Sequence, residues 1–372
     1  MSRRMYDLDN LRVALTALVI FFHTTIAYGA AGSWYLEDVD KSELTVPMIL
    51  LTIFTAVCQS FFMGLFFFIS GFFTPDSLSR KGTAKFLIDR FIRLGLPMLF
   101  YLLFLGPTTT YVAYYRHEES YYHFFTTTIL RARMPNFGPL WFAEALLYFV
   151  VLYAAYQLLL SKKAAGAQPR PFPSHRKLWI TAIICGLIAF LVRLIYPTGT
   201  GPWELQLGYF PLYILLFVMG TTAKRQGWLE QMPSTLVRRW RRIAYWTIPV
   251  LPIGLILTGA LEDDIEFAGG FNIQAFLYAM WEPFVCFGIC LALLAWFRAR
   301  WSSASSLFRG LGRSAYTAYV IHPIIVVSFT ALFMGSSLAP IIKLFIVGPL
   351  SIVICFAISL VIVRIPYVNK VL

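Results

Sequence analysis

The amino-acid sequence predicts an all-α fold, a polytopic integral membrane helical bundle of about ten transmembrane helices with both termini cytoplasmic. Three observations predict it. Of the 372 residues, 59% are hydrophobic and only 13% are charged, whereas soluble domains carry roughly 25% charged residues. Apolar windows of about 20 residues, the length that crosses a bilayer, recur along the whole chain. Basic residues collect in alternate connections between these windows, as expected of a multi-pass membrane protein.

The apolar windows give the spans in chain order. The expected spans are approximately residues 11–30, 47–73, 87–106, 140–160, 178–196, 208–223, 243–260, 272–297, 314–334 and 340–363. The connection at 107–139 is the longest on the expected outer side, and its Tyr-rich and Thr-rich composition suggests an interfacial or re-entrant helix. No internal repeat is visible, so we expect a single transmembrane domain over residues 1–372.

The net charge of +13 follows the positive-inside rule. Most of the 31 Lys and Arg residues lie in the expected inner connections. They include Arg3, Arg4 and the basic residues of the Pro-containing linker at 162–177. The expected outer connections instead carry the acidic stretches WYLEDVDKSE and ALEDDIEFAGG. This distribution predicts a multi-pass protein of the cell (inner) membrane, and it explains the basic charge without a nucleic-acid partner.

Two further expectations follow from the apolar windows. The first window is expected to be an uncleaved helix rather than a signal peptide, because His23 in its interior would be wasted in a discarded segment. The five cysteines all fall inside apolar windows and form no CxxC pair, so neither a disulfide framework nor a zinc site is indicated. No metal site is predicted.

Arg12 and His23 lie on the first expected span. An ionisable side chain inside the hydrocarbon costs about 2.5 to 3.5 kcal/mol on insertion scales, so each one raises a functional hypothesis. Eleven residues apart, the two side chains return to nearly the same helix face, about 16 Å apart along the axis. We therefore expect Arg12 at the cytoplasmic edge and His23 near mid-membrane. The structural alternatives, that Arg12 snorkels to lipid phosphates and His23 bonds a neighbouring helix, stay open.

Arg90 and Arg93 lie in DRFIRLGLP at the inner mouth of the third expected span. Two arginines at positions i and i+3 of a helix suit a phosphate-bearing ligand, although a positive-inside anchor explains them equally well. FFFISGFF ends the second expected span with Ser70 and Gly71. Small residues at such a place favour close helix packing over a nucleophile.

Three more ionisable residues fall within expected spans. Glu144 lies about one turn inside the outer end of its helix, and Glu282 lies near mid-membrane beside a proline. Either carboxylate could orient an imidazole by accepting its second N–H. His322 is also followed by a proline, and a local carbonyl is the alternative partner for its ring. His117 and His123 lie in the polar outer connection, where we expect solvated surface residues.

These residues together resemble those of membrane acyltransferase family 3. The first stretch resembles the opening of that family, with its Arg, ten intervening residues and His, and four further stretches follow in the family's order. The five stretches are DLDNLRVALTALVIFFHTTIAYG, FFFISGFF, RFIRLGLP, LWFAEALL and LGRSAYTAYVIHP. Two of these regions look closest to the branch that includes glucan biosynthesis protein C, which is associated with succinyl transfer.

The resemblance implies a function. Members move acyl groups from cytoplasmic acyl-CoA, a co-substrate rather than a bound cofactor, to hydroxyls of extracytoplasmic sugars. By position, the family's catalytic histidine is His23, and its arginines associated with the acyl donor are Arg12, Arg90 and Arg93. Some members add a C-terminal SGNH-type domain. This chain stops at Leu372, so no such domain is expected.

Residue chemistry and resemblance converge on one hypothesis: His23 is the general base for an acceptor hydroxyl that attacks the thioester. A serine such as Ser70, or His322, is the candidate donor to the oxyanion, and an acyl-enzyme intermediate stays open. Two other classes are kept as alternatives. A transporter or lipid flippase uses membrane acids and histidines as proton relays, and a haem protein could use His23 and His322 as ligands. The sequence specifies neither the acceptor, nor the acyl chain, nor the oligomeric state.

Overall fold

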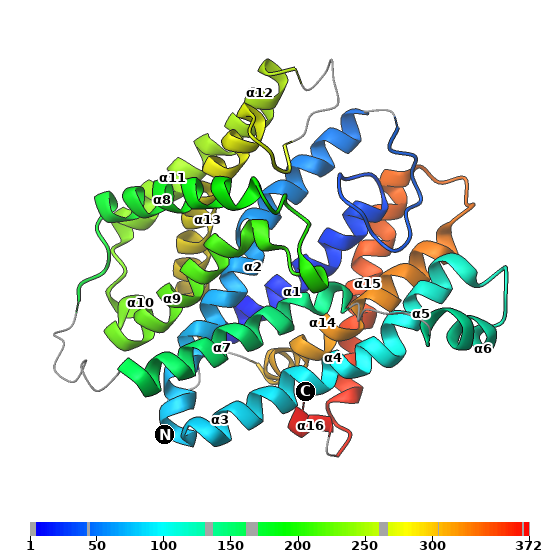
Figure 1. Ribbon diagram of the computed structural model, residues 1–372, viewed down its shortest axis with the longest axis horizontal. Helices are drawn as coiled ribbons and strands as arrows, with labels where there is room; N and C mark the ends of the chain where they lie inside the picture. Colours follow the sequence, from blue (N-terminus) through cyan, green and yellow to red (C-terminus); the bar gives the residue numbers. More distant parts are fainter. Residues whose placement is uncertain are drawn as a thin grey trace. The chain divides into compact units, whose positions relative to one another are not determined.

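A computed structural model describes residues 5–42, 45–130, 137–160, 170–259, 267–303, 305–366 and 368–371 (Figure 1). Helices make up all the regular secondary structure of these described residues. Arg3, Arg4, the first part of the linker at 162–177 and most of the acidic stretch at 260–270 lie outside them. The all-α prediction is confirmed.

The long helices are α1 (Tyr6–Ala27), α2 (Val46–Lys81), α7 (Trp141–Leu160), α8 (His175–Arg193), α9 (Phe210–Gln226), α11 (Ser234–Thr247), α13 (Ile273–Arg300), α14 (Ser306–Phe333) and α15 (Pro340–Ile362). The third helix is built from α3 (Thr83–Arg90), η1 (Phe91–Gly95), α4 (Leu96–Phe100), η2 (Tyr101–Leu105), α5 (Gly106–Thr110) and η3 (Tyr111–Tyr115). The short elements are α6 (Tyr121–Phe124), η4 (Phe125–Ile129), η5 (Gly138–Leu140), η7 (Pro202–Glu204), η8 (Leu207–Tyr209), α10 (Trp228–Gln231), α12 (Val250–Leu257) and α16 (Val368–Val371).

Nine helices within the described residues are long and apolar enough to cross a membrane. They correspond to all the expected spans except the seventh, at 243–260, which is broken into α11 and α12 at Pro249. Both pieces nevertheless run along α13, because Trp281 Nε1 donates to the Thr247 carbonyl at 2.7 Å and Gln274 Nε2 to the Thr258 carbonyl at 3.0 Å. The polytopic helical prediction is confirmed, but the seventh expected span consists of two shorter helices and is not one of the nine.

The third helix contains three π-helical turns, η1, η2 and η3. The first two are followed at once by short α segments that carry Pro97 and Pro107. Proline lacks an N–H and its ring clashes with the preceding turn, so a locally wider turn accommodates it. The helix continues to Tyr115, nine residues beyond the expected end at 106, and occupies part of the connection expected at 107–139.

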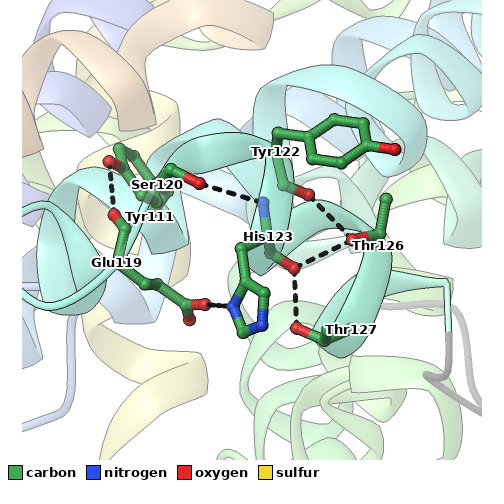
Figure 2. Close-up of polar contacts among 7 residues, drawn as sticks. All are labelled: Tyr111, Glu119, Ser120, Tyr122, His123, Thr126 and Thr127. Atoms are coloured by element: carbon green, nitrogen blue, oxygen red, sulfur yellow. Dashed lines mark hydrogen bonds and ion pairs between the residues drawn. The ribbon is translucent and has the colours of Figure 1, made fainter.

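A short helical segment, α6 and η4, follows the third helix (Figure 2). Ser120 caps it by accepting from the His123 amide at 3.3 Å, and the Thr127 hydroxyl donates to the His123 carbonyl at 2.6 Å. The His123 ring reaches back to the Glu119 carboxylate, and the Tyr111 hydroxyl donates to the Glu119 carbonyl at 2.9 Å. The His123 side chain is 65% exposed, so the prediction of a surface histidine is confirmed.

The chain packs as two compact units. The first comprises Met1–Cys58, Ile92–Leu140 and Ser303–Leu372, and the second comprises Gln59–Phe91 and Trp141–Ser302. Their boundaries fall inside α2 and inside the third helix. The expectation of one transmembrane domain stays a prediction.

In the first unit, α1 packs against α14 and α15, and α14 packs against α15 (Figure 1). The third helix contacts α14 through η2, α5 and η3. A cluster of buried apolar side chains joins the three long helices, with Ile20, Ala318 and Cys355 at its centre. These contacts place α1, near the N-terminus, beside α14 and α15, near the C-terminus.

In the second unit, α8 and α11 pack on α13. α2 and α9 meet through glycines: a Cβ on Gly71 would lie 2.3 Å from the Phe217 carbonyl oxygen, and one on Gly220 would lie 2.1 Å from that of Phe68. Contacts this short leave no room for a side chain, so the two helix backbones touch there. The interpretation of Gly71 as a packing residue is confirmed.

Candidate active site

A pair of histidines lies at the contact between α1 and α14. Nε2 of His322 is 3.0 Å from Nδ1 of His23, and Nδ1 of His322 is 2.5 Å from the carbonyl oxygen of Tyr319. His322 is fully buried. The parallel course of α1 and α14 creates this contact, because Arg12, eleven residues before His23, likewise reaches the Gly312 carbonyl of α14.

The hydrogen bonds assign the tautomers of the pair. A carbonyl oxygen can only accept, so Nδ1 of His322 carries the hydrogen that bonds Tyr319. In a neutral imidazole the other nitrogen then has a lone pair, and Nε2 of His322 accepts a hydrogen from Nδ1 of His23. The same rule leaves the lone pair of His23 on Nε2. The network thus orients His23 with a basic nitrogen on the side away from His322.

This geometry corrects two expectations for His322. Both of its ring nitrogens are engaged, so His322 is not placed to donate to an oxyanion. The direct bond between the two imidazoles also leaves no room for an iron and its macrocycle between them, as bis-histidine haem ligation requires. The partner of His322 is His23 as well as the local carbonyl.

The depth of His23 also differs from the expectation of mid-membrane. α1 runs from Tyr6 to Ala27, so His23 lies four residues, about 6 Å, from its C-terminal end. The expected span, residues 11–30, begins five residues after the start of α1 and ends three residues after its end. The centre of the expected span is therefore closer to His23 than the centre of α1 is. His23 therefore lies near the predicted outer end of α1.

Aromatic rings cover the histidine pair. The Trp34 ring stacks on the His23 ring with centroids 4.1 Å apart and planes 23° apart, and it is also nearly parallel to the His322 ring at 5.9 Å. Tyr319 stacks on His322 from α14 at 5.6 Å, and its hydroxyl donates to the Pro139 carbonyl. The imidazoles are held in a fixed plane by their neighbours.

The loop after α1 places Trp34 over the pair. Its two ends meet where the Asp38 amide donates to the Ala27 carbonyl at 2.9 Å. The Tyr35 hydroxyl is 2.8 Å from that of Tyr101 on the third helix, and Lys343 of α15 forms a buried ion pair with Asp38 at 2.6 Å. Three attachments to three different helices therefore hold the loop, which we call the Trp34 loop (residues 28–38).

Arg12 is on the face of α1 that contacts α14, as its spacing from His23 predicts. Its guanidinium forms an ion pair with Asp9 at 2.5 Å, and the Arg12 side chain is 35% exposed. The Arg12 side chain is thus partly exposed near the predicted inner end of α1. A role in donor binding stays a prediction.

Arg90 and Arg93 lie on either side of the boundary between the two units. Arg90 ends α3 and packs over the Phe86 ring at 5.3 Å, whereas Arg93 lies in the π-helical turn η1. Arg93 thus lies in a π-helical turn rather than in the continuous α-helix that the i, i+3 spacing assumes. Their joint action on a phosphate stays a prediction.

The expectation that Glu282 orients an imidazole is wrong. Within the second unit its carboxylate forms an ion pair with Arg193, and both side chains are buried. Arg193 also donates to the Gly208 carbonyl at 3.1 Å and lies over the rings of Tyr209 and Tyr278. A carboxylate in the hydrocarbon is satisfied here by a guanidinium rather than by a histidine.

The other two expected supporting residues also belong to the second unit. Glu144 is the fourth residue of α7, as its predicted position requires, and it accepts from the Tyr148 hydroxyl at 2.9 Å. The Ser70 carbonyl accepts from Thr74 at 2.8 Å on α2. The hydrogen-bond partner of His23 is His322, and the supporting roles of Glu144 and Ser70 stay predictions.

Sequence reasoning missed three residues that the structure makes prominent. Arg193 ends an apolar segment and was not singled out, because its buried partners come from other segments. Trp34 lies in an acidic outer loop and Tyr319 on an apolar helix, where aromatic residues are common. The positions of Tyr319 and His322 at i and i+3 were the one available signal for their contact.

The described residues therefore define a polytopic helical membrane protein whose α1 and α14 hold a pair of oriented histidines. The family model for the acyltransferase domain of membrane acyltransferase family 3 matches residues 5–360. The chain belongs to that family. The resemblance noted from the sequence is thereby confirmed.

Several bacterial relatives of this chain share one name, glucans biosynthesis protein C. The chain is 35% identical over 98 residues to glucans biosynthesis protein C of Shigella dysenteriae serotype 1 (strain Sd197). It is 34% identical over 98 residues to the proteins of that name in Escherichia coli O1:K1 / APEC and Escherichia coli O9:H4 (strain HS). The match covers 26% of this chain and 24% of each relative, so it spans about a quarter of their length.

Proposed function

We propose that this protein is an integral membrane O-acyltransferase that moves an acyl group from cytoplasmic acyl-CoA to a hydroxyl of an extracytoplasmic carbohydrate. His23 is the general base. The observation that carries the proposal is the chain of hydrogen bonds from the Tyr319 carbonyl through His322 to His23. A base oriented by a second group, which is itself fixed by a third, is the arrangement that activates hydroxyl nucleophiles in enzymes.

The reaction places one proton on His23. Nε2 takes the proton of the acceptor hydroxyl while the oxygen forms a bond to the thioester carbonyl carbon. The carbon–sulfur bond then breaks, and the sulfur leaves as a thiol with the proton returned by His23. The products are an ester and free CoA. His322 accepts from Nδ1 throughout, which keeps the imidazole in one orientation.

The donor is proposed to enter from the cytoplasmic side. Arg12 lies about 16 Å from His23 along α1, and both contact α14. A donor with a phosphate-bearing head and a long arm ending in a thioester matches that separation, because guanidinium groups bind phosphate well. Arg93, in the same unit, and Arg90 are proposed to add positive charge for the same head group.

The acceptor is proposed to be a glucan, and the protein is assigned to the inner membrane. The names of the curated relatives support a glucan, and the position of His23 near the predicted outer end of α1 suits an acceptor that arrives from outside. Succinyl and acetyl groups are the acyl chains to test first. Acyl-CoA, the glucan acceptor and the lipid bilayer are the partners that the proposal requires.

The test uses the full chain in lipid nanodiscs. Radiolabelled acetyl-CoA or succinyl-CoA is supplied with β-glucan oligosaccharides, and labelled ester and released CoA are both measured. His23→Ala is expected to insert and purify normally but to transfer nothing above background. His117→Ala, at an exposed position, is the matched control and is expected to retain full activity.

Two outcomes would contradict the proposal. Acyl transfer by His23→Ala at the rate of the natural protein would exclude His23 as the base. Movement of the intact oligosaccharide or lipid across a membrane, with no ester formed and no CoA released, would instead favour the transporter or flippase alternative.

A further inference from the structure

The indole of Trp34 lies directly on the ring proposed to carry the proton. The centroids of Trp34 and His23 are 4.1 Å apart, closer than those of His23 and His322 at 4.9 Å. All three rings are within 23° of parallel. The face of the indole, rather than its edge, is therefore the surface that His23 meets.

The indole is not held in place by its own N–H. Nε1 of Trp34 is buried and has no hydrogen-bond partner among the described residues. Its position instead follows from the Trp34 loop, where the Trp34 amide donates to Glu37 at 2.9 Å and the next residue, Tyr35, bonds Tyr101. A buried indole N–H without a partner is unfavourable. The attachments of the Trp34 loop keep the indole against His23 despite that cost.

The indole of Trp34 is the closest ring to His23, and both carboxylates of the Trp34 loop are paired with lysines. The titratable group that faces His23 from α14 is His322. On the loop, Asp38 is paired with Lys343 of α15 and Glu37 with Lys41. Arg12 lies at the other end of α1. Within the described residues, no carboxylate hydrogen-bonds to either imidazole.

We propose that Trp34 is a positioning residue of the acyl transfer whose indole face stabilises the imidazolium that His23 becomes when it takes the acceptor's proton. This inference rests on the proposed function. The face of an aromatic ring carries negative charge and attracts a cation, most strongly for indole and most strongly where water is excluded. His23 is neutral before the transfer and positive during it, so the attraction is greater in the transition state than in the ground state.

An interaction that strengthens only in the transition state raises kcat without changing substrate binding. Removing the indole is therefore expected to lower kcat and to leave KM for the acyl donor unchanged. A purely structural role would instead lower the amount of folded protein, or change KM and kcat together. The split between the two constants separates these explanations.

The experiment measures CoA release by the full chain in nanodiscs with acetyl-CoA, succinyl-CoA and β-glucan oligosaccharides. Trp34→Leu is expected to lower kcat roughly 5- to 30-fold, with KM for the acyl donor within about twofold. Trp34→Phe keeps a weaker aromatic face, and its kcat is expected to lie between those of the natural protein and of Trp34→Leu. Trp203→Leu removes a half-exposed tryptophan and is the matched control, expected to retain the natural kcat.

A second measurement keeps the shape of the ring. Fluorinated tryptophan, introduced at position 34 by nonsense suppression, has nearly the same size but a weaker negative face. It is expected to lower kcat progressively with the number of fluorine atoms, in a protein that folds normally. An unchanged kcat across the fluorinated series, or a Trp34→Phe variant as slow as Trp34→Leu, would overturn the inference.

The inference and the proposed function fail in different ways. If the natural protein transfers acyl groups and His23→Ala does not, a fully active Trp34→Leu variant contradicts the role of Trp34 alone. If His23→Ala is active, the proposed base is wrong, and the stack has no proton to stabilise.

Discussion

The hydrogen bond between Nε2 of His322 and Nδ1 of His23, 3.0 Å long, joins two residues that are 299 positions apart in the chain. It gives His23 a partner that the sequence offered only as a candidate, whereas Glu282, one of the carboxylates considered for that contact, pairs with Arg193. Because a carbonyl fixes the tautomer of His322 in turn, the pair has a defined direction, from the Tyr319 backbone toward the free lone pair of His23.

The first prediction concerns the hydrogen bond that Nδ1 of His23 donates to His322. His322→Leu removes the acceptor for Nδ1–H of His23 and is expected to lower kcat about 10²-fold or more, since general-base catalysis contributes 10²- to 10⁴-fold. His322→Gln can place its amide oxygen near the position of Nε2 and is expected to retain more activity than His322→Leu. Steady-state rates of CoA release measure both variants.

Tyr319→Phe is the matched control for that prediction. The contact with His322 comes from the backbone carbonyl of Tyr319, whereas its hydroxyl bonds the Pro139 carbonyl. Loss of the hydroxyl is expected to lower the free energy of unfolding by about 1 kcal/mol and to leave kcat close to that of the natural protein. Equal loss of kcat in Tyr319→Phe and His322→Leu would argue against the proposed relay.

The second prediction tests the acyl donor. Arg12→Ala is expected to raise KM for acyl-CoA roughly 10-fold or more, because one charge-assisted contact with phosphate contributes about 1.5 to 3 kcal/mol. The chemical step is expected to change little. Initial rates over a range of acyl-CoA concentrations give both constants.

Asp9→Asn provides the comparison for Arg12. It removes the carboxylate that forms the ion pair with Arg12, so KM for acyl-CoA is expected to stay the same or fall. If Arg12 only anchors α1 to lipid phosphates, Arg12→Ala will leave KM unchanged.

The third prediction concerns the buried ion pair of the second unit. Arg193→Met leaves the Glu282 carboxylate buried without its partner and is expected to lower the free energy of unfolding by about 3 to 5 kcal/mol. The double variant Arg193→Met/Glu282→Leu removes both charges and is expected to recover much of that loss. Thermal unfolding in detergent, followed by intrinsic fluorescence, compares the variants. A double variant as unstable as the sum of the single ones would show that the two charges are not coupled.

The fourth prediction concerns the Trp34 loop. Lys343→Met leaves Asp38 without its cation at a site where the two side chains are 6% and 11% exposed. The carboxylate is expected to turn toward water and to break the bond from the Asp38 amide to Ala27, so hydrogen exchange across residues 28–38 should become faster. Mass spectrometry of exchanged peptides measures this.

Lys41→Met is the control for the loop. Its ion pair with Glu37 is more exposed, at 23% and 27%, and exposed pairs contribute about 0 to 1 kcal/mol. Exchange across the loop is expected to change little. Unchanged exchange in Lys343→Met as well would mean that Tyr35 and the α1 end hold the loop without the ion pair.

Much of the fold could be predicted from the sequence because each transmembrane helix has a local signature. The apolar windows predict the nine spans found among the described residues, whereas the seventh expected span is two shorter helices, α11 and α12. The continuation of the third helix to Tyr115 was not predicted, because its Tyr and Thr residues suggested a separate interfacial or re-entrant helix. Local composition decides whether a segment enters a bilayer, but it decides less well where the helix stops.

For the site, the sequence by itself determined which ionisable residues lie in apolar segments, and that Arg12 and His23 share one face of α1. Periodicity along one helix is enough for that. Only the tertiary structure decided that His23 pairs with His322, that Glu282 pairs with Arg193, and that Trp34 covers the histidines. The physical reason is that hydrocarbon makes an unpaired buried charge or polar group costly, while the identity of its partner depends on which helices pack together and at what height.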